Sequence, residues 1–384
     1  MRNWGQSTLK ARNPEPIILL RADTDALPVQ ENTGAPYHSV HDGVMHACGH
    51  DMHITTLLAA VRLLADIRDH WTGTLIACFQ PCEETGTGAQ AMVDGGLYAD
   101  PDKVPTPQFV FGGHISPELA GTVSLTHGTA YARSDSWKAT FKGRGGHASR
   151  PEACIDPVVM AAFAITRLQT VVSRVVPSTS LGVLTVGEIH AGKKSNIIPN
   201  DAYITINMRA DSDDLAGKME AEMKNIIEAE VKASIPEYRE IEDNPTPPNP
   251  EFERLLYAPL LENKEPTATD IASVFQSVFG EDFNGFASIV PSSEDFQVLA
   301  LCNDKTKEIP YCYWRYGGTS LEKWEEAGGD VNLVPSNHSD NFLPQNDPEA
   351  DNDPLKSGTK AMCAAALSKF NLVGLENIEI SSTV

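Results

Sequence analysis

The sequence has 384 residues, 41% of them hydrophobic, and a formal net charge of -22 at pH 7. A chain of this length exceeds what one ordinary hydrophobic core holds, so we expect two domains. The acidic excess argues against nucleic acid or an anionic membrane as a partner, because both are bound through lysine and arginine.

Residues 1–16, MRNWGQSTLKARNPEP, lack the apolar run and cleavage site of a secretory signal. No stretch reaches the roughly 18 consecutive apolar residues of a membrane span. The seven cysteines are thinly scattered and odd in number, which fits a reducing compartment better than a disulfide framework. We therefore expect a cytoplasmic protein with no membrane partner.

The first third of the chain alternates strand-like and helix-like segments. Short apolar runs at 16–20, 74–79 and 109–111 predict buried strands, and each of them ends in polar residues. Between the first two, apolar residues recur at helical spacing over 54–65. This β-α-β order predicts an α/β domain with a largely parallel sheet and helices on both faces.

The next third carries a different pattern. The predicted order is β-α-β-β-α-β, which is the ferredoxin-like arrangement, with strands at 136–141, 181–189, 203–208 and 238–241 and helices at 157–168 and 213–231.

The proline-rich segment 244–250 predicts a linker back to the first domain. We therefore expect a catalytic domain made of 1–130 and 242–384, with an inserted α+β domain at 131–241. A turn-rich loop at 346–354 is expected before a last helix at 361–370.

The strongest local signal for chemistry is the segment 46–53, HACGHDMH, in which five potential metal ligands fall within eight residues. Thiolate and imidazole are the usual ligands of zinc in proteins. A zinc finger is disfavoured, because no second Cys/His pair follows at finger spacing. The alternative interpretation is a polar loop with surface histidines.

Two further signals follow the predicted strands. Glu83 and Glu84 come after a strand, where adjacent side chains are expected to point to different sides, so that one binds metal while the other moves a proton. His114 follows the Gly112-Gly113 pair at the end of the next strand. Taken singly, a solvated glutamate pair and a structural histidine are the simpler interpretations.

Convergence changes this balance, because the carboxyl ends of parallel strands share one edge of a sheet. The groups expected to meet there are Asp23, Asp25, Cys48, His50, Glu83, Glu84 and His114. Spacing alone does not place His338, which lies near the far end of the chain.

Four ordered motifs then identify a family: RADTDALPVQE (21–31), MHACGHDMH (45–53), QPCEETG (80–86) and GRGGH (143–147). SNIIP at 195–199 and SEDF at 293–296 follow in the same order. Through these motifs the sequence resembles the M20 family of metallopeptidases and amidohydrolases. It is most similar to the subgroup of N-acyl-amino-acid amidohydrolases, which includes hippurate hydrolases and auxin-conjugate hydrolases.

The resemblance implies two divalent metal ions per chain, with zinc favoured and manganese, cobalt or nickel as alternatives. The implied metal ligands are Cys48, His50, Glu84, His114 and His338. Glu83 is implied as the general base that activates a metal-bridged hydroxide, and Asp23 as the carboxylate that orients a ligand. The implied substrate-binding residues of the inserted domain are His147, Asn196 and Arg209. This domain is implied to be a lid that also forms a homodimer, with His147 acting across the dimer interface.

The implied function is hydrolysis of the amide bond of N-acyl-L-amino acids. Two alternatives stay open: a dipeptidase or carboxypeptidase of the same family acting on short peptides, and a metal-poor, catalytically impaired binding protein. The second arises because relatives carry a further helix and strand before the segment at 21–31. A nucleotide-binding Rossmann protein is disfavoured, because 143–147 lacks the G-x-G-x-x-G spacing.

Overall fold

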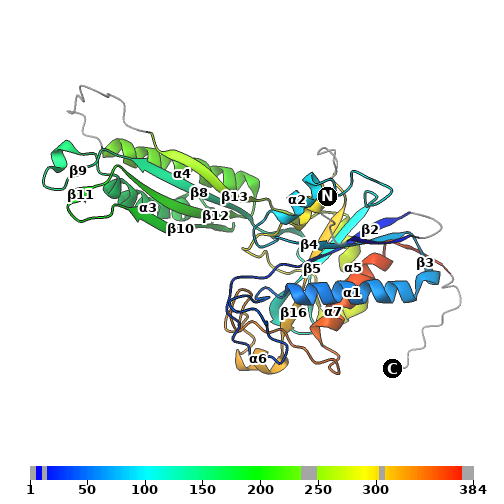
Figure 1. Ribbon diagram of the computed structural model, residues 1–384. Coiled ribbons are helices and arrows are strands. Elements are labelled where there is room, and N and C mark those ends of the chain that lie inside the picture. Colours follow the sequence, from blue (N-terminus) through cyan, green and yellow to red (C-terminus); the bar gives the residue numbers. More distant parts are fainter. Residues whose placement is uncertain (1–5, 11–14, 235–248, 302–307, 374–384) are drawn as a thin grey trace. The chain divides into compact units, whose positions relative to one another are not determined.

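The computed structural model describes residues 6–10, 15–234, 249–301 and 308–373 (Figure 1). The chain forms two compact units. Unit 1 consists of Met1–Ala130, Glu262–Ser288 and Asp295–Val384, and unit 2 of Tyr131–Leu261 and Ile289–Glu294.

Unit 1 is built on a seven-stranded sheet that is largely parallel, as predicted. In spatial order its strands are β1 (Gln6–Lys10), β4 (Thr74–Gln80), β2 (Ile17–Asp23), β5 (Phe109–Leu119), β16 (Tyr311–Thr319), β6 (Val123–Ser124) and β15 (Phe283–Asn284). The pairs β4–β2, β2–β5, β5–β16 and β6–β15 are parallel, whereas β1–β4 and β16–β6 are antiparallel.

Helices cover both faces of this sheet, as expected. On one face Phe111 and Trp314 join a core with three helices, α1 (His50–Asp66), α5 (Thr267–Phe279) and α7 (Pro354–Leu367). Figure 1 shows α1 and α7 side by side, in keeping with the contacts between them. The neighbouring residues Gly112 and Tyr313 face the opposite side, toward Phe296 of the 3₁₀ helix η4 (Phe296–Ala300), which packs with α2 (Gly88–Asp94).

Two predicted boundaries in unit 1 were wrong. β5 does not end at residue 111 but continues to Leu119, because it pairs with β16 from Val110 to Ser116 and again at Leu119, and this places His114 within the strand opposite Arg315. The last helix starts at Pro354 rather than near residue 361. Its start is fixed by Asp353, whose side chain accepts a hydrogen bond from the Leu355 amide at 2.8 Å.

Unit 2 is a four-stranded antiparallel sheet packed against two helices. Its strand order is β10 (Gly182–Ala191), β12 (Asp201–Ala210), β8 (Arg133–Lys142) and β13 (Glu251–Ala258), and its helices are α3 (Pro157–Arg174) and α4 (Asp213–Ala233). Taken in chain order, the strands and helices follow the predicted β-α-β-β-α-β sequence.

The fourth strand of unit 2 lies beyond residue 241, where we expected the inserted domain to end. The strand predicted at 238–241 lies outside the described residues. β13 begins after the proline-rich segment 244–250, so that this segment precedes the edge strand of unit 2 rather than leaving the domain.

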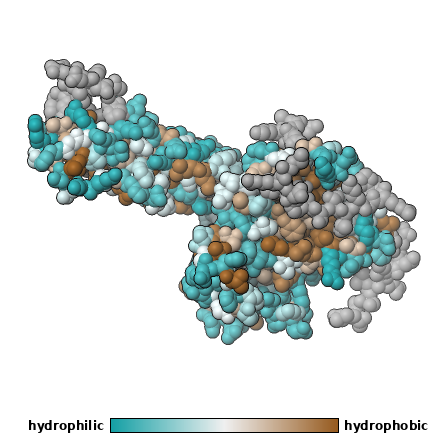
Figure 2. All heavy atoms as spheres, viewed as in Figure 1, coloured by the Kyte–Doolittle hydropathy of each residue, from teal (hydrophilic) through white to brown (hydrophobic). Residues whose placement is uncertain are grey.

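The remaining elements are short. They are η1 (Arg68–His70), β3 (Trp71–Thr72), β7 (Gly128–Tyr131), β9 (Gly146–His147), η2 (Pro151–Ala153), β11 (Ile197–Ile198), β14 (Leu261–Asn263), η3 (Gly280–Asp282), α6 (Leu321–Glu326) and β17 (Asn371–Leu372). None of the described helices combines the length and hydropathy needed to cross a bilayer. Hydrophilic residues cover most of the face shown in Figure 2, with hydrophobic residues in separate patches.

Candidate metal centre

The five residues expected to bind metal lie together in unit 1. They form overlapping groups in which one donor atom per residue lies within 4.8 Å of the others: Cys48–His50–His114, Cys48–Glu84–His338 and, with Glu83, His50–Glu83–Glu84. Sequence-distant segments supply these side chains. Cys48 lies in the turn before α1, His50 begins α1, Glu83 and Glu84 lie in the turn after β4, His114 lies within β5, and His338 lies in the loop before α7.

The separations inside the cluster are close to coordination reach. The Sγ atom of Cys48 lies 3.5 Å from Nε2 of His114, and Nε2 of His338 lies 3.2 Å from a carboxylate oxygen of Glu84. Nε2 of His50 lies 3.8 Å from one oxygen of Glu83 and 3.8 Å from one oxygen of Glu84.

The expectation that Glu83 and Glu84 point to different sides was wrong, because both carboxylates approach the same nitrogen of His50. β4 ends at Gln80, and the two glutamates lie in a turn rather than in extended backbone. The amide of Gly88 closes this turn by donating to the carbonyl of Cys82 at 3.1 Å.

Gly49 allows Cys48 and His50 to face the same site. Its φ of 79° lies in the left-handed region, where residues with a Cβ are strained. A Cβ on Gly49 would also lie 2.5 Å from Cγ2 of Ile115. The sharp turn and the close packing on β5 both therefore require glycine between the two donors.

The donor set fits divalent cations. Nε2 of His50 and Oε1 of Glu84 are buried, face each other at 3.8 Å and have no hydrogen-bond partner among the described residues. Buried polar atoms without partners are costly and rare in native proteins. A bound cation would satisfy both atoms, and thiolate, imidazole and carboxylate together are typical zinc ligands.

The electrostatics of the cluster favour positive charge. Burial raises the pKa of the Cys48 thiol well above its usual range, and the carboxylates of Glu84, Glu83 and Asp23 raise it further. Burial would lower the pKa of His50, but Asp23, Asp25 and Glu84 outweigh it and raise the pKa to about 9. A divalent cation would replace that proton and stabilise the thiolate.

The backbone carbonyl of the next residue, Ile115, orients the ring of His114 for coordination. Its Nδ1 lies 2.6 Å from the carbonyl oxygen of Ile115, so the proton on Nδ1 is donated there and Nε2 faces Cys48 with its lone pair. Burial lowers the pKa of His114 to about 4. The ring is therefore neutral at pH 7, as a metal ligand must be.

His53, the fifth potential ligand of the 46–53 segment, is occupied elsewhere. Its Nε2 accepts the Ile115 amide at 2.9 Å, and its Nδ1 forms a short hydrogen bond with Asp23. Asp23 is fully buried, lies 2.6 Å from Arg21 and lies 3.7 Å from Nε2 of His50. Although burial opposes ionisation, Arg21 and His53 hold the pKa of Asp23 well below its usual range.

Asp25 and Asp295 also position the cluster, a role that was not predicted for either residue. Asp25 lies 3.3 Å from Nδ1 of His50 and accepts the amide of Glu84 at 3.0 Å, so it touches two donor segments. Below Asp23, the carboxylate of Asp295 accepts hydrogen bonds from Gln80 at 2.5 Å, from Arg21 at 3.4 Å and from the Ala89 amide at 2.9 Å. A D-x-D pattern and the SEDF motif were the available signals.

The residues expected to bind substrate belong to unit 2, where they lie in two places. His147 and Asn196 are neighbours, since β9 pairs with β11 and the Ala148 amide donates to the Asn196 carbonyl at 3.1 Å. Arg209 lies near the far end of β12, about 25 Å along the strand from Asp201 at about 3.3 Å per residue. Asp201 marks the end of β12 that follows β11, the strand that pairs with His147.

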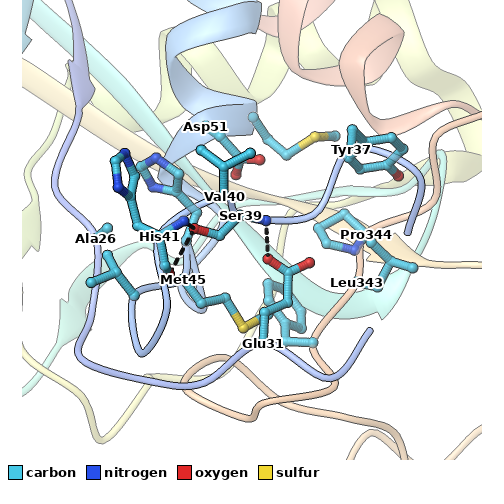
Figure 3. A pocket seen from close by; sticks show the side chains of 14 residues that line it. Ala26, Glu31, Tyr37, Ser39, Val40, His41, Met45, Asp51, Leu343 and Pro344 are labelled. Atoms are coloured by element: carbon cyan, nitrogen blue, oxygen red, sulfur yellow. Dashed lines mark hydrogen bonds between the residues drawn. The ribbon is translucent and has the colours of Figure 1, made fainter. Parts of the chain in front are cut away.

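A pocket of about 300 Å³ lies beside the turn that carries Cys48 and His50. Figure 3 shows Ala26, His41 and Met45 on one side of it and Tyr37, Leu343 and Pro344 on the other. None of the five donor residues is among the 14 that line it. Phe342, one of the lining residues, also packs near Gly49, so the pocket adjoins the backbone between Cys48 and His50 but is not lined by their side chains.

Comparison with known proteins gives consistent matches. The sequence profile described as peptidase family M20/M25/M40 matches residues 19–326. An N-acetyl-L-cysteine deacetylase of Bacillus subtilis (strain 168) is 32% identical over 311 residues, which are 78% of this chain and 73% of that protein. A hippurate hydrolase of Campylobacter jejuni is 36% identical over 292 residues, which are 75% of this chain and 71% of that protein.

Solved structures agree with these matches. A putative aminohydrolase from methicillin-resistant Staphylococcus aureus superposes with a TM-score of 0.74 at 25% identity, covering 94% of this chain and 84% of that one. The Bacillus subtilis YXEP protein, described as a dinuclear metal binding peptidase, superposes with a TM-score of 0.70 at 25% identity, covering 94% and 83%.

Proposed function

Because the chain belongs to peptidase family M20/M25/M40 and is a hydrolase of amide bonds, we propose that its substrates are N-acyl-L-amino acids. The names of two relatives support this substrate class, since hippurate and N-acetylcysteine are both N-acyl amino acids. A dipeptidase or carboxypeptidase is the alternative within the family. The convergence of Cys48, His50, Glu84, His114 and His338 carries the proposal.

We propose that these five side chains hold two divalent cations, as in the dinuclear YXEP protein. Zinc is favoured by one thiolate and three imidazoles. Bound there, the cations supply Lewis-acid chemistry that acidifies a water molecule and polarises the scissile carbonyl. Asp23 keeps its charge through Arg21 and His53, and its carboxylate lies 3.7 Å from Nε2 of His50, where it would help to hold a cation at that nitrogen.

Glu83 is proposed as the general base. Its carboxylate lies at the cluster, 3.8 Å from Nε2 of His50, within reach of a water in the site. It takes one proton from the attacking water as the C–O bond forms. It then delivers this proton to the leaving nitrogen as the C–N bond breaks, which gives a carboxylate and a free amino acid.

Arg209 is proposed to bind the carboxylate of the substrate. Its guanidinium donates to the Pro291 carbonyl at 2.9 Å and to the Asn207 side chain at 3.1 Å. No described carboxylate forms an ion pair with it, and burial lowers its pKa. A half-buried cation without an acidic neighbour suits a carboxylate ligand, which pairs with arginine through two parallel hydrogen bonds.

We further propose that unit 2 pairs with a second copy of the chain. His147 and Arg209 of one copy lie too far apart along unit 2 to touch one small substrate, so His147 would serve the partner's site. β10 is an edge strand, and Ile189 on it and Phe163 on α3 are 50% and 61% exposed. An unpaired edge beside exposed apolar side chains favours strand pairing.

One pair of variants tests the proposed chemistry. In Glu83→Gln we expect full metal content and a loss of turnover of about 100- to 10,000-fold, the usual range for a general base. In Glu84→Gln we expect reduced metal content. Metal analysis and hydrolysis of N-acetyl-, N-benzoyl- and dipeptide substrates give the readouts. A Glu83→Gln variant with the wild-type rate contradicts the assignment, and a wild-type protein without metal or turnover supports a binding protein instead.

Light scattering tests the pairing. Wild-type protein is expected to be a dimer, and Phe163→Glu a monomer with reduced turnover and unchanged metal content. A fully active wild-type monomer would exclude a contribution from a partner.

A further inference from the structure

The loop before α7 contains a side chain that contacts two of the donor segments at once. Asn337 donates from Nδ2 to the carbonyl oxygen of Cys48 at 3.1 Å and to that of Ile115 at 3.3 Å. The same nitrogen lies 3.7 Å from Sγ of Cys48. One amide group therefore joins the turn before α1 to β5.

The carbonyl of Ile115 links this amide to a third donor. His114 directs its Nδ1 to the same oxygen at 2.6 Å, so that Asn337 and His114 share one acceptor. Movement of this carbonyl would rotate the His114 ring, whose Nε2 faces Cys48. Asn337 thus fixes the group that sets the orientation of His114.

The next residue in the chain is His338. Its backbone has a φ of 71°, in the left-handed region that disfavours a residue with a Cβ. Its amide donates to the Ala47 carbonyl at 2.7 Å, which ties the loop to the turn beside the Asn337 contact. These two anchors hold His338 in its unfavourable backbone conformation, with Nε2 3.2 Å from Glu84.

We propose that Asn337 is a positioning residue that sets the spacing of Cys48, His114 and His338 and so tunes the metal affinity of the cluster. The inference rests on the proposed function, because it assumes that these residues bind metal. Hydrogen bonds to the groups behind metal ligands typically change affinity by about 10- to 100-fold.

Competition titrations with a chelator test the inference, using Zn²⁺ as the probe. Asn337→Ala is expected to bind Zn²⁺ about 10- to 100-fold more weakly than the wild type. The protein loaded with Co²⁺ is expected to show a weaker, shifted thiolate-to-cobalt absorption band. In saturating metal, kcat should fall while KM changes little, since Asn337 is not placed against substrate.

Asn341→Ala provides the matched control. This exposed asparagine lies in the same loop, and its side-chain amide donates to Asp340 at 2.9 Å and to no other described residue. Its Zn²⁺ affinity and cobalt spectrum should equal those of the wild type. If Asn337→Ala does not fold, Asn337→Leu carries the same expectation, because it has a similar volume and removes the amide donor without adding a metal-binding group.

Wild-type Zn²⁺ affinity and an unchanged cobalt band in the Asn337 variant would overturn the inference while leaving the hydrolase assignment intact. A wild-type protein that binds neither ion would instead overturn the proposed function.

Discussion

Two charged clusters in this protein are built in opposite ways. In unit 2, Arg133 and Arg254 approach buried Asp135 at 2.7 and 3.3 Å. Glu220 likewise contacts Arg254 at 2.9 Å and Lys224 at 2.7 Å. Each of these carboxylates has cations beside it, so the cluster is complete in itself.

In unit 1, four carboxylates surround one imidazole. Oxygens of Asp25, Asp23, Glu83 and Glu84 lie 3.3, 3.7, 3.8 and 3.8 Å from nitrogens of His50. Arg21 directly pairs with Asp23, at 2.6 Å. The comparison teaches that charge density alone does not mark a functional site. What distinguishes the cluster in unit 1 is that it contains buried side-chain atoms without a hydrogen-bond partner among the described residues, such as Nε2 of His50 and Oε1 of Glu84.

Removal of divalent cations should produce the largest difference between the two clusters, in activity and in stability. Chelation is expected to reduce amide hydrolysis by more than about 1,000-fold, since removing even one oxyanion donor costs about 100- to 1,000-fold. It should also lower the stability of unit 1 by about 4 kcal/mol if the ion was present at ~1,000 times its Kd.

Hydrogen exchange followed by mass spectrometry locates this effect. Peptides from α1 and β4 should lose protection on chelation, whereas peptides from β8 and β12 should not change. Equal loss of protection in both units would contradict the expectation that the cations stabilise unit 1 alone.

Removing the buried carboxylates should give the next largest difference. Asp23→Ala removes the carboxylate 2.6 Å from Arg21, which is 1% exposed and keeps Asp295 at 3.4 Å, and is expected to cost about 3–5 kcal/mol of folding stability. Asp135→Ala should cost only about 1–2 kcal/mol, because Arg133 and Arg254 are 12% and 38% exposed and water can solvate them. Urea unfolding measures the loss of stability in both variants. A larger loss in Asp135→Ala than in Asp23→Ala would contradict the expected order.

The smallest effect is expected at an ion pair that belongs to neither cluster. Lys218 and Asp214 lie 2.5 Å apart on α4, with side chains 62% and 77% exposed. Lys218→Ala should change stability by no more than about 0.5 kcal/mol. Its metal content and turnover should equal those of the wild type, which makes it a baseline for the other variants.

Periodicity predicted the parts of the fold that repeat regularly. β8 and β12 alternate buried and half-buried residues and were located to within a few positions. β16 was not predicted, because its nine buried residues show no alternation and because Arg315 and the Gly317-Gly318 pair interrupt the kind of apolar run that predicted β2 and β4. A strand buried on both faces gives no period-2 signal.

The site followed from ordered motifs together with the expected convergence of strand ends. The expected ligands Cys48, His50 and Glu84 lie in the quoted motifs, His114 was placed by the convergence, and His338 came from the resemblance alone. Asn337 and Asp25 were not predicted as positioning residues, since their role depends on contacts between segments up to 289 residues apart. The shared direction of Glu83 and Glu84 also escaped prediction, because it arises from a turn and not from strand geometry.

The place of β16 in the sheet sets an order for biosynthesis. This strand occupies an interior position between β5 and β6, although it comes from residues 311–319 of 384. The ribosome therefore completes the early strands long before the strand that joins them to β6 and β15, and His338 emerges later still. A site that includes His338 can therefore form only after β16 and the loop that follows it have been synthesised.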